Sequence, residues 1–90
     1  YEVFAAAARD ETLDLGEVVH RTRIEDLWLA PASGALVTLE RRFGLRSGMG
    51  LALSRSLETV AARYDYCLVD CPPTLGVLVI NALVCCEQLI

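Results

Sequence analysis

The stretch YDYCLVDCPPTLG, residues 64–76, constrains the fold of this chain more than any other part of its sequence. Residues 66–69 are apolar at every position instead of at alternate positions, which is typical of a strand covered on both faces. Asp70 follows at once, and Pro72 and Pro73 then end the strand because proline cannot donate a hydrogen bond to a ladder. The pattern therefore predicts a buried strand with one carboxylate at its carboxyl end.

Helical signals surround this strand. Met49, Leu53, Leu57 and Val60 recur at spacings of four, four and three residues, the period of a helix with one face on a core. Gly44 is typical of the residue that closes a helix. We expect helices over residues 1–9, 10–21, 33–43, 46–63 and 76–86, and strands over 26–30, 66–69 and 88–90.

Strands that alternate with helix-length connections predict an α/β fold, in which a parallel sheet has helices on both faces. Ligands of such sheets bind at the carboxyl ends of the strands, where Asp70 is expected. An aspartate there can hold a phosphate-bound Mg2+, although many strands end in aspartate only for turn or capping reasons. The chain begins at Tyr1 and stops within an expected strand, so we expect it to be an internal segment of one domain.

The composition predicts a soluble globular unit in the cytoplasm. Hydrophobic residues make up 54% of the chain, yet no run reaches the ~20 apolar residues that a membrane-spanning helix needs. The formal net charge of -4 argues against the stretch as a whole being a nucleic-acid contact surface, which would need a basic face. All 8 basic residues are arginine, so lysine is absent.

The cysteines lack the spacing of a metal site. Cys67 and Cys71 have three residues between them, Cys85 and Cys86 are adjacent, and His20 is the only histidine that could join them. We therefore expect small buried thiols in a reducing cytoplasm.

Several single residues have both a structural and a functional interpretation. For Asn81, within an apolar helix, we expect a structural hydrogen bond in preference to a ligand contact. We expect Trp28 to pack against a helix, with base stacking as the alternative, and His20 to lie on the surface. A small basic cluster is expected on a solvated helix face, with DNA or a partner protein as the alternative; it comprises Arg41, Arg42 and Arg46.

The string YDYCLVDCPPTLGVLVINAL, residues 64–83, resembles the ParA/Soj group of the ParA/MinD family of deviant-Walker ATPases. The resemblance extends upstream through TLDLGEVV, residues 12–19, IEDLWLAPAS, residues 24–33, and a following helix that contains Glu40. It implies a partial P-loop NTPase fold, with residues 1–90 as an internal part of a single ParA-type ATPase domain.

This resemblance also implies a function. It is that of a cytosolic ATPase that forms an ATP-dependent homodimer, binds nonspecific DNA through regions outside this segment, and positions DNA or protein cargo with a ParB-like or cargo-adaptor protein. Asp70 would be the Walker B aspartate that binds Mg2+, often through water, and Cys71, Pro72 and Pro73 would form the switch that senses the γ-phosphate of ATP. The double proline favours the ParA side over MinD-like proteins.

The missing lysine limits what the segment can do alone. The phosphate loop of this family is K-G-G-x-G-K-[ST], so the chain cannot contain it. GLRSGMG, residues 44–50, lacks the GK[ST] ending and is expected to connect helices. We expect no catalytic residue and no ATP turnover in the segment by itself. The alternatives are a MinD-like membrane-cycling ATPase and a non-catalytic α/β interaction module.

Overall fold

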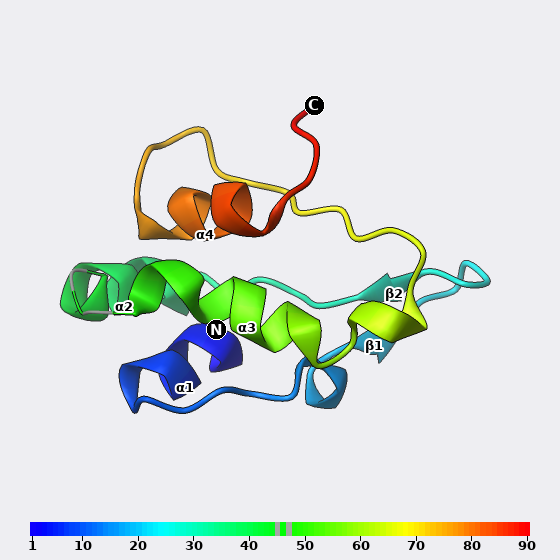
Figure 1. Cartoon of the computed structure of the whole chain (residues 1–90), viewed down its shortest axis with the longest axis horizontal. Coiled ribbons are helices and arrows are strands. Elements are labelled where there is room, and N and C mark those ends of the chain that lie inside the picture. The colour runs from blue at the N-terminus through cyan, green and yellow to red at the C-terminus, as the bar shows by residue number, and fades with distance from the viewer. Residues whose placement is uncertain (45, 47) are drawn as a thin grey trace.

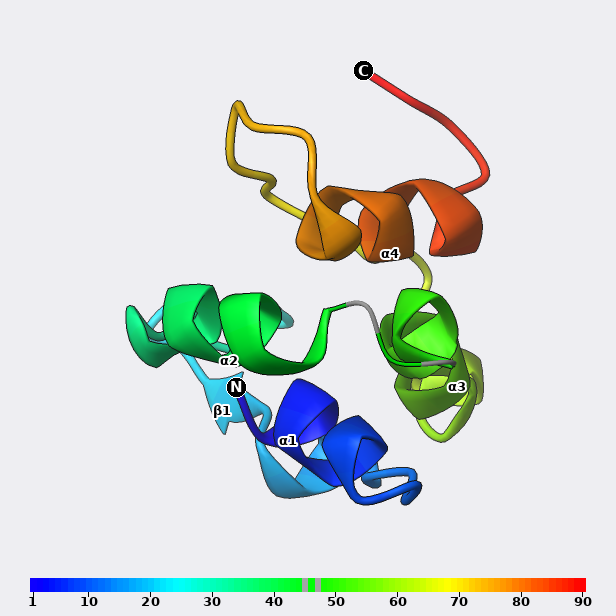
Figure 2. The same ribbon diagram turned by 90° about the vertical axis from the view of Figure 1, so that its left-hand side faces the viewer.

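Four α-helices in three layers dominate residues 1–44, 46 and 48–90, which the computed structural model describes (Figures 1 and 2). Helix α4, Val77–Cys85, lies above α2, Ala35–Phe43, and α3, Ala52–Glu58, while α1, Glu2–Ala8, lies below them. Three short 3-10 helices and two short strands complete the described structure: η1 Leu15–Glu17, η2 Met49–Leu51, η3 Ala61–Arg63, β1 His20–Arg21 and β2 Trp28–Leu29.

Local sequence signals place three of the helices where we expected them. Helix α1 lies within the alanine-rich first nine residues, and alanine has the highest helix propensity. Near the start of α2, the Ser33 hydroxyl accepts a hydrogen bond from the Ala35 N–H at 3.2 Å. At its end, the N–H of Gly44 donates to the Glu40 carbonyl at 2.8 Å. Helix α4 matches the prediction for residues 76–86 within one residue at each end.

The hydrophobic core lies between α1, α2 and α3. The apolar stripe predicted for residues 49–60 is confirmed: Met49 is 1% exposed and Val60 3% exposed, and Leu53 and Leu57 pack against the core while partly buried. Burial of such side chains contributes about 1.5–3 kcal/mol each to folding. The buried core cluster comprises Val3, Phe4, Leu15, Leu39, Met49, Ala52 and Val60.

The prediction of a helix over residues 10–21 is wrong. Only η1 is helical there, and its N-cap is Asp14, whose carboxylate accepts from the Gly16 N–H at 2.9 Å. Glycine and the valines after it disfavour extension of the helix. The loop is held instead by a distant contact, because the Leu15 N–H donates to the Thr59 hydroxyl at 3.0 Å.

The helix expected over 46–63 is divided. Residues 49–63 form η2, α3 and η3 in succession instead of one continuous helix. Gly48 precedes η2 with a φ of 87°, a left-handed conformation that favours glycine. Leu45 and Ser47, and with them part of the expected GLRSGMG connection, lie outside the described residues.

The expected parallel sheet is absent from the described residues. Strands β1 and β2 pair antiparallel, with His20 opposite Leu29 and Arg21 opposite Trp28. Residues 64–76, hereafter the crossing segment, run beside α4 without joining a sheet (Figure 1), and residues 88–90 are not a strand. The strand expected over 66–69 needs neighbouring backbone on both edges, and the described chain supplies none.

Trp28 is 41% exposed, and its expected packing against a helix stays a prediction. Its ring lies under the Arg21 guanidinium, with 5.2 Å between the guanidinium carbon and the ring centroid. This cation–π pair crosses the two strands of the hairpin. His20 is exposed, as predicted.

The described helices are all too short to cross a membrane.

Candidate functional site

Asp70 lies in the exposed crossing segment, together with Cys71, Pro72 and Pro73. Within the described chain, residues 65–75 exchange no backbone hydrogen bond with any other residue. The side-chain contact here is local, because the Cys71 thiol donates to the Val69 carbonyl at 3.6 Å. The predicted site residues are therefore adjacent in space, but no other described element packs them into a closed site.

The side chains near Asp70 fit a metal ion whose ligands come mainly from outside the protein, such as phosphate oxygens and water. No group of three or more His, Cys, Asp or Glu side chains in the described residues could hold a metal. Asp70 alone offers one carboxylate, which suits Mg2+ when phosphate oxygens and waters supply the remaining positions. A cage made of protein ligands does not fit these residues.

The first turn of α4 lies against the Glu40 carboxylate, for which the sequence predicted no contact. Glu40 of α2 accepts a hydrogen bond from the Leu78 N–H at 3.3 Å. The Leu78 amide of this turn therefore faces Glu40. A negative charge is favourable there because the first N–H groups of a helix lack partners and carry the positive end of its dipole.

Gly76, the N-cap of α4, makes this approach possible. A side-chain Cβ at this position would overlap Oε1 of Glu40 and lie 3.2 Å from its Cδ. The Gly76 φ is -168°, which any residue adopts, so a larger residue here would conflict with the present position of the Glu40 carboxylate and not with the backbone conformation. The sequence signal that could have found this pair is an apolar helix that begins after glycine without Ser, Thr, Asp or Asn as its cap.

Asn81 joins α4 to η2 and α3. Its side-chain amide donates to the carbonyls of Met49 at 2.8 Å and Val77 at 2.7 Å, and its oxygen accepts from the Leu53 N–H at 3.0 Å. The residue is 0% exposed. The predicted structural role is confirmed, because every polar atom of this buried side chain is used within the fold.

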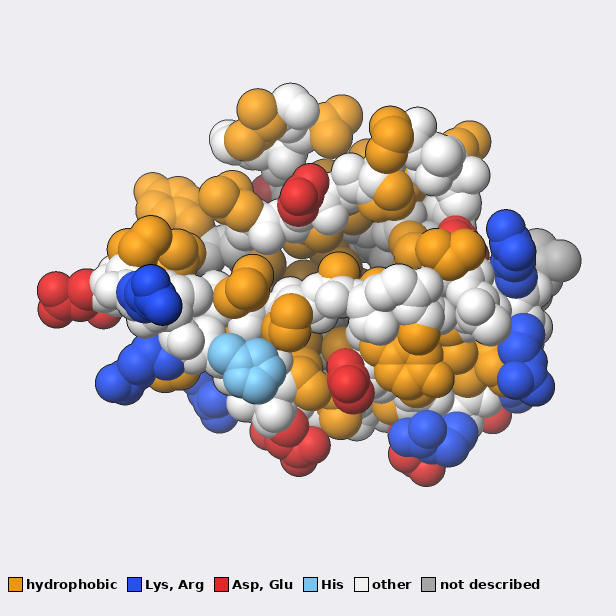
Figure 3. Space-filling view, turned by 180° about the vertical axis from the view of Figure 1, so that it is seen from behind, with side chains coloured by type: hydrophobic (Ala, Val, Ile, Leu, Met, Phe, Trp, Pro, Cys, Tyr) orange, Lys and Arg blue, Asp and Glu red, His pale blue; other side chains and the backbone are white. Residues whose placement is uncertain are grey.

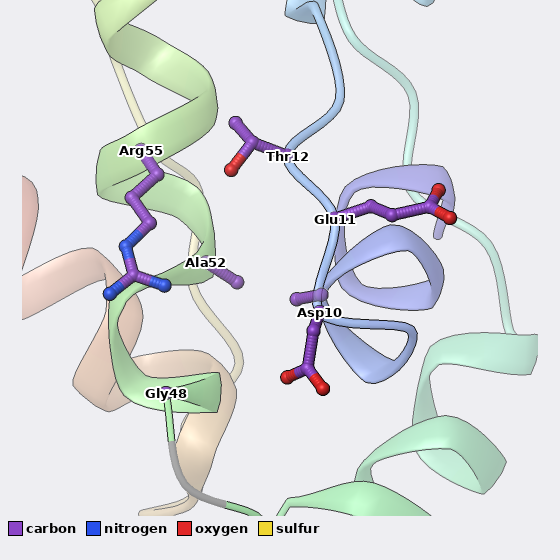
Figure 4. Close-up of a pocket in the computed structure, with 7 residues that line it drawn as sticks. Asp10, Glu11, Thr12, Gly48, Ala52 and Arg55 are labelled. Carbon is purple, nitrogen blue, oxygen red and sulfur yellow. The ribbon is translucent and has the colours of Figure 1, made fainter.

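A small pocket between the end of α1 and α3 does not have the features of a nucleotide site. Figure 4 shows Arg55 of α3 facing Asp10 and Thr12 across it. Its volume of about 90 Å³ is below the ~300 Å³ at which ligand pockets begin. Asp10 also contributes a carboxylate, which repels phosphate.

Large apolar side chains are exposed along α4 and the crossing segment. Hydrophobic atoms cover much of the upper part of the molecule in Figure 3, the level at which α4 lies. Tyr66 is 89% exposed and Leu68 85% exposed, which reverses the burial that their pattern predicts. This surface also includes Val69, Leu75, Ile80, Leu83, Val84, Leu89 and Ile90.

The basic cluster lies on the surface, as predicted. Arg41, Arg42 and Arg46 are exposed, and the guanidinium groups of Arg42 and Arg46 lie over the ring of Phe43. The Arg46 guanidinium also donates to the Ala8 carbonyl, which ties this part of the chain to the end of α1.

Three of the four cysteines are exposed, so the expectation of buried thiols is wrong for Cys67, Cys71 and Cys86. Cys85 is partly buried at the end of α4, and its thiol donates to the Ala82 carbonyl at 3.3 Å. Burial raises the pKa of the Cys85 thiol, and the nearby Cys67 thiol raises it further.

We expect Cys85 to be alkylated more slowly by iodoacetamide than Cys71, by roughly severalfold near pH 8, because the thiolate is the reactive form. The raised pKa leaves less thiolate on Cys85 at any pH below that pKa, so the difference should narrow as the pH rises. Tandem mass spectrometry of the complete protein after timed alkylation measures both rates. Faster alkylation of Cys85 would contradict this prediction.

Comparison with known proteins identifies the family. The model of the AAA domain family matches residues 1–90, the full length of the chain. The chain is similar to the sporulation initiation inhibitor protein Soj of Bacillus subtilis, at 35% identity over 77 residues, covering 86% of this chain and 30% of Soj. It is also similar to the chromosome partitioning protein ParA of Myxococcus xanthus, at 31% identity, covering 98% of this chain and 30% of that protein.

A third relative is the chromosome-partitioning ATPase Soj of Treponema pallidum, at 32% identity, covering 98% of this chain and 33% of that protein. The chain thus spans about a third of the length of these curated relatives. No solved structure matches it significantly. The chain belongs to the AAA domain family along its whole length, and within that family it is similar to the ParA/Soj-type partitioning ATPases.

Proposed function

We propose that this chain is the Walker B and switch portion of a ParA-like ATPase. In the complete protein, residues 66–69 would form a strand of a parallel P-loop NTPase sheet. That protein would form an ATP-dependent homodimer in the cytoplasm and bind nonspecific DNA. With a ParB-like or cargo-adaptor protein, it would partition or position DNA or protein cargo.

One observation carries this proposal. Asp70 is followed by Pro72 and Pro73 in an exposed crossing segment that leads into α4, and the chain around it matches the AAA domain family over residues 1–90. The names of the relatives, which are partitioning proteins, support the cargo-positioning role. The covered-strand pattern of residues 66–69, set against their present exposure, supports a larger sheet around them.

The residues have distinct proposed roles. Asp70 would bind Mg2+ with its carboxylate, and the metal would neutralise charge on the phosphates of ATP. Pro72 and Pro73 would hold the chain extended after Asp70, because each fixes its own φ and restricts the residue before it. Cys71, which lies between Asp70 and Pro72, would be the third residue of the switch.

Association and DNA binding of the complete protein test the proposal. We expect ATP to convert the protein from monomer to dimer in sedimentation experiments and to raise its affinity for nonspecific duplex DNA by roughly tenfold or more. The affinity should fall with added salt, because phosphate contacts release counterions. If ATP changed neither property, the proposal would fail, and ATP-dependent binding to anionic vesicles without DNA binding would support the membrane-cycling alternative.

A further inference from the structure

The crossing segment is held at its two ends. At its start, Tyr64 packs against the core cluster while partly buried. Residues 65–75 then have no backbone hydrogen bond to the rest of the described chain. At its end, Gly76 lies directly against the Glu40 carboxylate, and α4 begins. The position of the segment after Asp70 therefore depends on how firmly this second end is held.

Two independent contacts hold that end to α2. Glu40 accepts from the Leu78 N–H at 3.3 Å and covers the Cα of Gly76. A Cβ on Gly44, directly after α2, would lie 3.2 Å from Cγ1 of Val77, so the end of α2 and the start of α4 also approach each other closely there. The carboxylate and the first turn of α4 attract one another, because the turn carries unpaired N–H groups and the positive end of the helix dipole.

We propose that Glu40 is a positioning residue, whose carboxylate fixes the distance between α2 and the start of α4 and so sets the position of the metal-binding Asp70 and the switch residues 71–73. This inference rests on the proposed ATPase function. The described contacts of Glu40 at this end are with Leu78 and Gly76, which follow residues 70–73 in the chain. Glu40 acts through Gly76 and Leu78, which are the residues that the crossing segment leads into.

Hydrogen exchange of the Leu78 amide tests the anchor directly in the complete protein. In Glu40→Ala, which removes the acceptor, we expect this amide to exchange roughly fivefold faster or more. In Glu40→Gln, which keeps an oxygen acceptor without the charge, exchange should lie between wild type and Glu40→Ala. Glu58→Gln, the same change on an exposed glutamate of α3, is the matched control and should leave this amide unchanged.

Gly76→Ala provides a second route to the same change. Because the new Cβ would overlap the carboxylate, it should displace Glu40 and accelerate exchange at Leu78 as Glu40→Ala does. The double variant Glu40→Ala with Gly76→Ala should then exchange no faster than either single variant, since both remove one contact. If the two substitutions accelerated Leu78 exchange additively, Glu40 and Gly76 would act separately and the inference would be wrong.

ATP turnover tests the positioning role. In Glu40→Ala we expect kcat to fall roughly tenfold, because a misplaced switch lowers turnover without removing a contact to ATP. The dissociation constant for ATP should change less than about twofold. Glu40→Gln should recover much of kcat. If Leu78 exchanged faster while kcat stayed at the wild-type value, Glu40 would be an anchor without a positioning role, and the inference would be wrong.

The two proposals fail in different ways. Absence of ATP turnover in the wild-type protein would remove the proposed function, while the exchange of Leu78 in the Glu40 and Gly76 variants would still show whether the anchor exists. Suppose instead that the wild type hydrolyses ATP normally and that Leu78 exchange is unchanged in the Glu40 and Gly76 variants. The inference about Glu40 would then be wrong, and the proposed function would stand.

Discussion

Asp70→Asn is expected to lower the ATP turnover of the complete protein by at least about 100-fold, because metal-assisted stabilisation of phosphate charge contributes several kcal/mol and each 1.36 kcal/mol is a factor of ten. Asparagine keeps the size of the side chain and removes its charge. Asp70 is exposed and lies in a segment without backbone hydrogen bonds to the rest of the described chain, so the substitution should leave the fold unchanged. Steady-state phosphate release, measured over a range of Mg2+ concentrations, gives the effect.

Asp65→Asn is the matched control, because Asp65 is also an exposed aspartate of the crossing segment. It precedes the apolar residues 66–69, so it lies on the other side of them from the switch. Its turnover should stay within about twofold of wild type, as expected for a surface substitution away from the chemistry. Equal losses in both variants would show that negative charge in the segment matters and that Asp70 has no specific metal-binding role.

Asn81→Ala is expected to lower the free energy of unfolding by about 3 kcal/mol, a large effect for a polar side chain. The substitution removes the Asn81 partner of the Leu53 N–H and one of the two donors to the Met49 carbonyl, which keeps the Ala52 N–H, and it opens a cavity. Each unsatisfied buried group costs about 1–3 kcal/mol. Chemical denaturation followed by circular dichroism measures the change.

One further variant separates the hydrogen bonds of Asn81 from its volume, and a second variant is a control. Asn81→Asp keeps the shape but replaces the donating amide by an oxygen that faces the carbonyls of Met49 and Val77, so it should destabilise the protein at neutral pH. Gln88→Ala removes an exposed amide and should change the free energy of unfolding by less than about 0.5 kcal/mol. A loss below about 1 kcal/mol for Asn81→Ala would contradict the hydrogen-bonded role.

Helices were predictable here because their signals are local. The alanine run of α1, Gly44 after α2 and the stripe from Met49 to Val60 all act within a few residues of one another. The strand over 66–69 was not, because a strand is stabilised by hydrogen bonds to other segments, and no such partner lies in the described chain. The helix expected over 10–21 failed for the same reason, since Thr59 holds that loop from 44 residues away.

The candidate site was predictable in part. The sequence placed Asp70 beside Pro72 and Pro73, and this adjacency is covalent. It did not reveal Glu40, which meets Leu78 across 38 residues of chain. Asn81 was identified because a lone amide in an apolar helix must find partners, but the identity of those partners again depended on how the helices pack.

The exposed crossing segment has a consequence for solubility. An extended stretch with unpaired backbone groups and large apolar side chains is a template on which other chains can add as strands, and this is how many proteins aggregate. Pro72 and Pro73 cannot donate hydrogen bonds to such an added strand, so strand addition is confined to the residues before them. In addition to their proposed role in the switch, the two prolines are therefore expected to act as gatekeepers against fibre-like assembly.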